Sequence, residues 1–259
     1  MNLLAAALAL DLGPILEAFR RDGYARLGVI APPGSLEPLR ARAEALMLGT
    51  VPNGDYFFQE DAESYDALPY GKGWQGPSLR YRKMEKLERD PLFRAAIENP
   101  LFGKIASQLL GPDLALCRAV LFTKPVGGGS ALPWHQDGGP FWGLSRDPEL
   151  QLWTALDDAP VGAGCVEVIP GSHQSGLATP QGGVVPAEVS ARAGAEERAV
   201  PLPARAGEVI LLHNHLWHRS GVNLGAQQRR ALTVCLLAAD VRCTRKRRPR
   251  QFVRLFDAR

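Results

Sequence analysis

Apolar residues in the first part of the chain recur at helical spacings. The first series contains Leu4, Leu8, Leu12, Ile15 and Phe19. Its steps of three and four residues are typical of one face of an amphipathic helix. The apolar run 1–10 also resembles a signal sequence, but no basic residue precedes it, as a signal sequence would require. We therefore favour a packed N-terminal helix.

Further helices are predicted before residue 114. The stretch 35–48 is rich in Ala, Leu and Arg, which favour helix, and an extended segment over 25–30 precedes it. Two more helices are predicted over 91–99, where Asp90 can cap the first turn, and over 101–110. No apolar stretch is long enough to span a membrane, so no membrane partner is expected.

The pattern changes after residue 114. Short apolar and β-branched runs now alternate with Gly and Pro turns, which is typical of a β sandwich or barrel. The runs cover 116–124, 133–137, 150–156, 165–169, 208–213 and 231–239. We expect a mainly β fold with about eight strands and flanking helices, some N-terminal and some inserted.

The segment 51–79 fits neither pattern. It combines Gly, Pro and Asp with six aromatic residues: Tyr56, Phe57, Phe58, Tyr65, Tyr70 and Trp74. It is too polar for a core and too aromatic for a plain linker, which favours a functional loop or lid.

The composition is that of an ordinary globular protein. The 259 residues are 46% hydrophobic and 22% charged, which suits a single domain over 1–259. We expect a mainly helical part over 1–113, a β core over 114–240 and a basic segment over 241–259. The four cysteines are scattered and form no C-x-x-C pair, which predicts reduced thiols and a cytoplasmic location. Oligomeric state cannot be predicted from this sequence.

The net charge of +3 is unevenly distributed. Six basic residues and no acidic ones lie between Arg242 and Arg250. Such a run can bind nucleic acid or an anionic substrate. No aromatic interleaving or recognition helix accompanies it, so we favour a solvated surface and do not expect nucleic acid as a partner.

Candidate chemistry begins at His135-Gln136-Asp137. Residues i and i+2 of a strand point to the same side, so His135 and Asp137 can project together. An imidazole and a carboxylate suit Fe(II) and leave coordination positions free. The tripeptide alone is weak evidence, because chance often produces it.

A second segment, 201–229, contains the remaining chemistry. A turn at Gly207-Glu208 leads into an apolar strand, and His213, His215 and His218 follow. Each of these histidines could complete a metal site with the first pair, and the spacing alone does not choose among them.

These two segments together resemble the phytanoyl-CoA dioxygenase-like family of Fe(II)/2-oxoglutarate oxygenases. The family motif is H-x-D, then Gly-Asp/Glu before an apolar strand, then H-x-S-G-x-N, with an Arg eleven residues after the last His. Here the run 218–223 reads His-Arg-Ser-Gly-Val-Asn, and Arg229 stands at the matching distance. The resemblance therefore selects His218. It implies a double-stranded β-helix, a cupin-like jelly roll, with Fe(II), 2-oxoglutarate and O2 as cofactors.

The resemblance also implies roles for residues outside the triad. Arg229 would bind the far carboxylate of 2-oxoglutarate, Ser220 would add a hydroxyl donor, and Trp153 in the W-x-A-L strand would lie beside it. Lys83 lies near a position where some members direct a basic group toward 2-oxoglutarate. Asp22-Gly23-Tyr24 and Pro170-Gly171-Ser172-His173 also match family turns, and we interpret His173, like His213 and His215, as structural.

The identity of one ligand indicates the reaction type. In related halogenases Ala or Gly replaces the carboxylate, whereas this chain has Asp137. The resemblance thus implies a hydroxylase that releases succinate and CO2.

The substrate is less well defined. We expect a small molecule: an acyl-CoA, an amino acid or a secondary metabolite. The basic C-terminal segment would suit CoA or a carrier protein. The residues expected at the substrate pocket are Trp74, Arg82, Phe141 and Trp142, and Arg80 and Arg146 are further candidates for an anionic group.

Two other kinds of protein share this fold. One is a cupin-like enzyme that uses the metal as a Lewis acid, and the other is a non-catalytic metal-binding member. The presence of Arg229 and Trp153 argues against the first. A non-catalytic member would be expected to lose a metal ligand or the arginine, whereas this chain retains the three ligands and Arg229.

Overall fold

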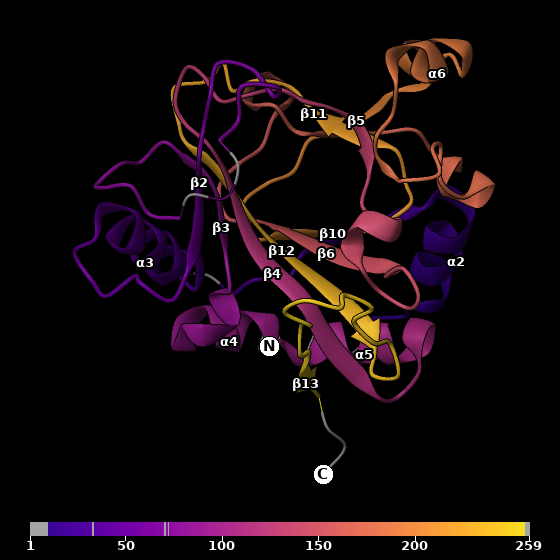
Figure 1. Ribbon diagram of the computed structural model, residues 1–259, viewed down its shortest axis with the longest axis horizontal. Coiled ribbons are helices and arrows are strands. Elements are labelled where there is room, and N and C mark those ends of the chain that lie inside the picture. Colours follow the sequence, from indigo (N-terminus) through magenta and orange to yellow (C-terminus); the bar gives the residue numbers. More distant parts are fainter. Residues whose placement is uncertain (1–9, 33, 70, 72, 257–259) are drawn as a thin grey trace.

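The structure, a computed structural model, describes residues 10–32, 34–69, 71 and 73–256. Two antiparallel sheets face each other, and helices cover the outer side of the larger one (Figure 1). This arrangement confirms the predicted jelly roll with flanking helices.

The larger sheet has the order β1-β10-β6-β12-β4-β3-β2, with β13 also paired to β4. Its strands are β1 (Tyr24–Val29), β2 (Phe57–Glu60), β3 (Tyr81–Glu85), β4 (Leu114–Lys124), β6 (Leu150–Ala155), β10 (Glu208–Leu212), β12 (Arg229–Ala238) and β13 (Val253–Leu255). The smaller sheet has the order β8-β5-β11-β7-β9. Its strands are β5 (Leu132–Gln136), β7 (Val166–Val168), β8 (Gly183–Val184), β9 (Val200–Leu202) and β11 (His218–Ser220).

Helices precede the β core and also interrupt it. The α-helices are α2 (Gly13–Asp22), α3 (Leu36–Leu48), α4 (Pro91–Ile97), α5 (Pro100–Leu110), α6 (Ala187–Arg192) and α7 (Ala195–Arg198). Single 3-10 turns are η1 (Leu87–Arg89), η2 (Pro140–Trp142), η3 (Val161–Ala163) and η4 (Ser172–Ser175). The helices α2 to α5 supply the layer that packs on the larger sheet (Figure 1).

Period-two alternation in the larger sheet separates a core from a pocket. In β12, Leu232 and Val234 pack among the helices, whereas Arg229 and Thr233 line the space between the sheets. At one end this space is filled by apolar side chains of both sheets, including Val168 and Ile210. Beside this cluster, side chains of both sheets also line a pocket.

The predicted helices are largely confirmed. Asp90 caps α4, and its side chain accepts hydrogen bonds from the backbone N–H groups of Leu92 and Phe93. The helix α2 begins at Gly13, and Pro14 lies in its first turn, where proline is tolerated. The residues predicted as helix before it, 1–9, lie outside the described residues.

Gly23 ends α2 in a left-handed conformation, with φ of 80°. A Cβ at this position would lie 2.6 Å from Nδ1 of His173 and 2.8 Å from Cδ1 of Leu216. Glycine avoids both the conformational cost and these contacts. Gly23 therefore lets α2 pack closely against the segment that leads to His218.

The number of strands is close to the expectation for the β core. Nine of the thirteen strands in the described residues lie within 114–240, where about eight were expected, and β1, β2, β3 and β13 lie before or after that range. The predicted lid over 51–79 is partly a sheet edge, since β2 pairs with β3 through Phe58 and Met84.

The basic C-terminal segment packs beside η2. Arg245 donates a hydrogen bond to the carbonyl of Phe141 and Arg250 to that of Trp142. Among the described residues, no helix is both long and apolar enough to cross a membrane. The division into three parts along the chain stays a prediction, as does the cytoplasmic location.

Candidate metal and co-substrate site

His135, Asp137 and His218 come together at the open end of the jelly roll. His135 on β5 and His218 on β11 are direct cross-strand partners, and their ring centroids lie 4.0 Å apart. Asp137 follows β5 immediately, and its Oδ2 lies 3.8 Å from Nε2 of His218. Each of the three residues offers one potential ligand atom, and these three atoms lie within 4.8 Å of one another. The three side chains can therefore hold one metal ion.

Backbone carbonyls orient both imidazoles. Nδ1 of His135 lies 2.9 Å from the carbonyl of Pro133, and Nδ1 of His218 lies 2.9 Å from that of Leu216. These contacts favour the tautomer with hydrogen on Nδ1, which leaves the Nε2 lone pair free for a metal. Burial and the neighbouring His218 lower the pKa of His135 to about 3. Its ring is therefore neutral at pH 7, as a metal ligand must be.

Asp137 is held by one hydrogen bond and one ion pair. Gln151 on β6 donates to Oδ2 at 2.8 Å, and Nη2 of Arg118 on β4 lies 3.1 Å from the same oxygen. Burial opposes ionisation of Asp137, but the positive charge of Arg118, together with His218, His135 and the hydrogen bond from Gln151, outweighs it and holds the pKa well below its usual range. The Arg118 guanidinium also stacks 4.2 Å from the ring centre of Trp142.

The other histidines have separate roles. Nε2 of His215 lies 2.8 Å from Oδ2 of Asp147, and the His213 ring packs between Phe19 and His173. Within the described ranges, none of these three histidines belongs to the metal-competent group. The geometry therefore favours His218, as the family resemblance did.

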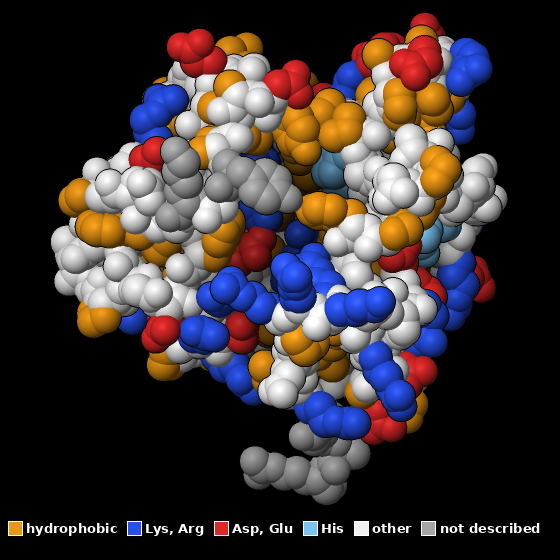
Figure 2. Space-filling model, in the orientation of Figure 1, with side chains coloured by type: hydrophobic (Ala, Val, Ile, Leu, Met, Phe, Trp, Pro, Cys, Tyr) orange, Lys and Arg blue, Asp and Glu red, His pale blue; other side chains and the backbone are white. Residues whose placement is uncertain are grey.

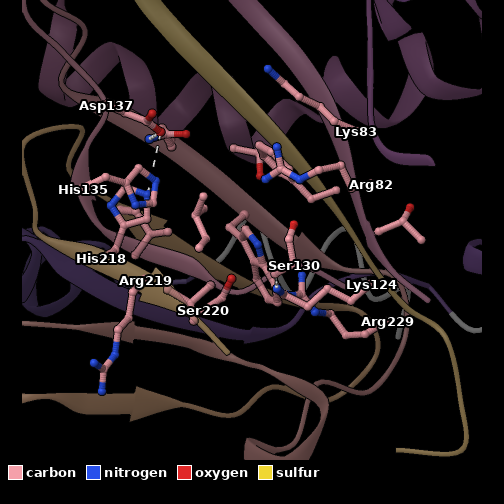
Figure 3. A pocket seen from close by; sticks show the side chains of 18 of the residues that line it. Arg82, Lys83, Lys124, Ser130, His135, Asp137, His218, Arg219, Ser220 and Arg229 are labelled. Carbon is pink, nitrogen blue, oxygen red and sulfur yellow. Dashed lines mark hydrogen bonds and ion pairs between the residues drawn. The ribbon is translucent and has the colours of Figure 1, made fainter. Parts of the chain in front are cut away.

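A pocket of about 190 Å³ contains the triad. Figure 2 shows a hollow in this face of the molecule, with apolar side chains at its upper rim and basic side chains below it. The close view shows the triad on one side of the pocket and Lys124 with Arg229 on the other (Figure 3). A ligand that reaches from the triad to Arg229 would thus cross the pocket.

Arg229 is a buried cation to which no described carboxylate is paired. Its side chain is 3% exposed, its Nη2 donates to the carbonyl of Gly164 at 2.8 Å, and its Nε has no hydrogen-bond partner among the described residues. Burial lowers its pKa to about 10, so it stays charged at pH 7. A buried unpaired charge is costly, and a carboxylate ligand would offset that cost. Ser220 and Trp153 line the same pocket.

The remaining predicted residues are found in different surroundings. Arg82 and Lys83 line the pocket, and Lys83 pairs with Glu85. Trp74 lies outside the pocket lining and donates its indole N–H to the carbonyl of Met47. Phe141 is 67% exposed. Trp142 does not line the pocket itself, but it stacks on Arg118, which does.

Of the two other arginines proposed for an anionic group, neither lines the pocket. Arg146 pairs with Asp240, and Arg80 is exposed. These arginines and the aromatic residues Trp74, Phe141 and Trp142 are therefore not pocket walls in this structure.

Sequence reasoning missed Arg118, Lys124 and Gln151. A signal existed, because each is a polar residue in an otherwise apolar, buried strand. Arg118 and Lys124 are also an even number of residues apart on β4, which puts them on one face.

Comparison with known proteins identifies relatives of this chain. The family model for phytanoyl-CoA dioxygenase (PhyH) matches residues 19–231. The phytanoyl-CoA dioxygenase domain-containing protein 1 of Bos taurus is 31% identical over 158 residues, which cover 58% of this chain and 54% of that protein. L-proline trans-4-hydroxylase of Streptomyces griseoviridis is 28% identical over 168 residues, 56% of this chain and 62% of that protein.

The chain spans about half the length of the first curated relatives that it matches. Among solved structures, the epimerase SnoN in complex with Fe3+, alpha ketoglutarate and nogalamycin RO superposes with a TM-score of 0.70 at 21% identity. The match covers 93% of this chain and 87% of SnoN, which shows a shared fold. With the family model matched over most of its length, the chain belongs to the phytanoyl-CoA dioxygenase family.

Proposed function

We propose that this protein is an Fe(II)- and 2-oxoglutarate-dependent dioxygenase that hydroxylates a small molecule and releases succinate and CO2. One observation carries the proposal: a two-histidine, one-carboxylate group and a buried arginine without a described carboxylate partner share one pocket. A metal site alone would need only the two histidines and the carboxylate, whereas the buried arginine provides for a carboxylate co-substrate.

The residues fit the implied metal. His135, Asp137 and His218 offer two nitrogen atoms and one carboxylate oxygen, the ligand set of non-haem Fe(II) oxygenases. When bound there, Fe(II) would supply the activation of O2 that couples decarboxylation of 2-oxoglutarate to substrate oxidation. Because Asp137 occupies the carboxylate position, hydroxylation is favoured over halogenation.

Arg229 would orient 2-oxoglutarate. Its guanidinium can form a fork with the carboxylate farthest from the metal, and Ser220 would add a hydroxyl donor. Trp153, 4% exposed, would form an apolar wall beside the co-substrate. These contacts hold one end of the co-substrate and keep water away from the triad.

Turnover of 2-oxoglutarate tests this proposal. The protein is supplied with Fe(II), 2-oxoglutarate and O2, and succinate is measured with and without acyl-CoA, amino acid and secondary-metabolite candidates. We expect slow succinate formation without a substrate and faster formation with the right one. The matched control is Asp137→Ala, which should form none. Metal binding without any succinate, in the full panel, would favour the non-catalytic alternative.

A further inference from the structure

Asn214 forms hydrogen bonds in both directions with the backbone of the metal ligand Asp137. We propose that Asn214 is a positioning residue of the metal site, which fixes the place of the Asp137 carboxylate relative to the two imidazoles. This inference rests on the metal site of the proposed function, and it concerns a residue outside the metal-competent group.

The strand β5 ends one residue before this ligand. His135 pairs with β11 and with β8, and the last residue of β5, Gln136, pairs with β8. Within the described strands, no ladder partner faces Asp137. Backbone N–H and C=O groups that leave a sheet in a partly buried region need other partners. The structure must therefore hold the Asp137 backbone by contacts outside the sheet.

Asn214 supplies both partners. The N–H of Asp137 donates to the backbone carbonyl of Asn214 at 2.8 Å, and Nδ2 of Asn214 donates to the backbone carbonyl of Asp137 at 2.9 Å. The side-chain amide thus replaces the N–H that a neighbouring strand would offer. Because a carbonyl can only accept, the amide atom that faces it is nitrogen. This contact therefore fixes the orientation of the Asn214 side chain.

Asn214 is itself anchored to the larger sheet. Its side chain is fully buried, and Sγ of Cys235 on β12 lies 3.7 Å from its Nδ2 and 3.9 Å from its Oδ1. Its backbone N–H donates to the carbonyl of Glu149, the residue before β6, at 3.4 Å. The strands β6 and β12 are neighbours in the larger sheet. Asn214 therefore connects the backbone of Asp137 to the two strands at the centre of the fold.

This anchor matters because the metal ligands come from opposite sides. His135 and His218 belong to the smaller sheet, whereas Arg118, on β4 of the larger sheet, pairs with the Asp137 carboxylate. Arg118 restrains the carboxylate, and Asn214 fixes the backbone from which that carboxylate projects. The distance between the carboxylate and the imidazoles therefore depends on Asn214. A shift of the Asp137 backbone would move one ligand away from the other two.

A second buried asparagine provides a matched control. Asn223 is fully buried, like Asn214. Its Nδ2 also donates to backbone carbonyls, which belong to Lys124, Pro125 and Gln227. None of these belongs to the metal-competent group. Replacing either asparagine should destabilise the protein, because buried carbonyls lose a donor, but only replacement of Asn214 should weaken metal binding.

Metal titration tests this inference. Fe(II) is titrated anaerobically, without 2-oxoglutarate, into the unmodified protein, Asn214→Leu and Asn223→Leu, and calorimetry gives each affinity. Leucine keeps the branched shape of asparagine but removes its donor. We expect Asn214→Leu to lower Fe(II) affinity by about 10- to 100-fold, as for other residues that hold a metal ligand in place. Asn223→Leu should change it by less than about 3-fold. Asn214→Ala is a second variant, and thermal unfolding midpoints verify folding.

A double-mutant comparison shows whether Asn214 acts through Asp137. Asn214→Leu is combined with Asp137→Ala, which leaves the two histidines as ligands. Ni(II) is the probe for this comparison, because such sites bind it more tightly than Fe(II). If Asn214 positions the carboxylate, Asn214→Leu should lower Ni(II) affinity when Asp137 is present and change it by less than about 3-fold in the Asp137→Ala protein. A general loosening of the fold would lower the affinity in both backgrounds.

Several results would overturn the inference. These are unchanged Fe(II) affinity in the Asn214 variants, an equal loss in Asn223→Leu, or the same loss of Ni(II) affinity with and without Asp137. Failure of the unmodified protein to bind Fe(II) would overturn it together with the metal site. Fe(II) binding without succinate formation would refute the proposed function alone, because none of these titrations depends on turnover.

Discussion

Nη2 of Arg118 lies 3.1 Å from Oδ2 of Asp137, the carboxylate of the metal triad. Gln151 donates to the same oxygen at 2.8 Å. An ion pair and a hydrogen bond to the same oxygen restrain the rotation of the carboxylate beside the two imidazoles. Partners of this kind contribute about 10- to 100-fold to metal affinity. Arg118 is thus a positioning residue for the metal site.

Replacing Arg118 should weaken metal binding. We expect Arg118→Gln to lower Fe(II) affinity by about 10- to 100-fold, as measured by anaerobic titration calorimetry. Arg219→Gln is the matched control, because Arg219 lines the same pocket but pairs with Glu167 and Glu196. Partial rescue by Arg118→Lys would support the role of the charge. Unchanged Fe(II) affinity in Arg118→Gln would contradict it.

The contrast between Arg118 and His135 shows what could be predicted from this sequence. The H-x-D spacing, the distant His218 and Arg229 form a local pattern, so the triad could be expected before the fold was known. Arg118 belongs to no such pattern. Whether a residue on a buried strand faces the pocket or the helices depends on which strands pair, and a single sequence does not specify this pairing.

The fold was predictable to a similar extent. Long periodic elements such as α5 and β12 were expected close to their observed bounds. The strand β11, which carries His218, is only three residues long and shows no period of its own. Trp74 was expected at the pocket because it is aromatic and lies in a polar loop. Its indole instead satisfies a carbonyl at the end of α3, a tertiary contact that local sequence does not reveal.

Loss of a triad ligand should abolish turnover. Asp137→Ala and His218→Ala each remove one of three ligand atoms, so we expect no detectable succinate. His215→Gln is the control, because His215 pairs with Asp147 outside the triad. Its activity should persist if the protein stays folded. Full turnover in either alanine variant would refute the triad assignment.

Arg229→Gln should raise the 2-oxoglutarate requirement. Removing the charged partner proposed for the far carboxylate should weaken apparent affinity by about 100-fold or more. Ser220→Ala should have a smaller effect, because it removes one neutral donor. The half-saturating concentration for succinate formation measures both. An unchanged value in Arg229→Gln would mean that the co-substrate binds elsewhere.

Gly23→Ala should destabilise the fold. The residue has φ of 80°, and a Cβ would approach Nδ1 of His173 to 2.6 Å. We expect a loss of about 1–3 kcal/mol in the free energy of unfolding, measured by denaturant titration. Gly28→Ala is the matched control, since Gly28 has φ of 75° but a Cβ there would approach no described atom beyond its chain neighbours within 4 Å. Equal losses in both variants would show that close packing against His173 contributes nothing.

Lys124 should give the stability of the protein a distinct pH dependence. Burial and repulsion from Arg229 and Arg82 lower its pKa from 10.5 to about 7, although Asp61 opposes this shift. Between about pH 7 and 10.5 the unfolded chain therefore holds a proton on this lysine that the folded chain has released. Stability rises with pH wherever the unfolded state binds more protons, so Lys124 becomes less destabilising as the pH rises through this window.

Replacing Lys124 with methionine tests this dependence, because Lys124→Met removes the charge but keeps much of the volume. We expect the variant to be more stable than the unmodified protein near pH 7, since the cost of burying the charge is then absent. The difference should shrink as the pH increases toward about 10. Denaturant titrations of both proteins at matched pH measure this difference in the free energy of unfolding. A difference independent of pH would show that Lys124 has an ordinary pKa in the folded protein.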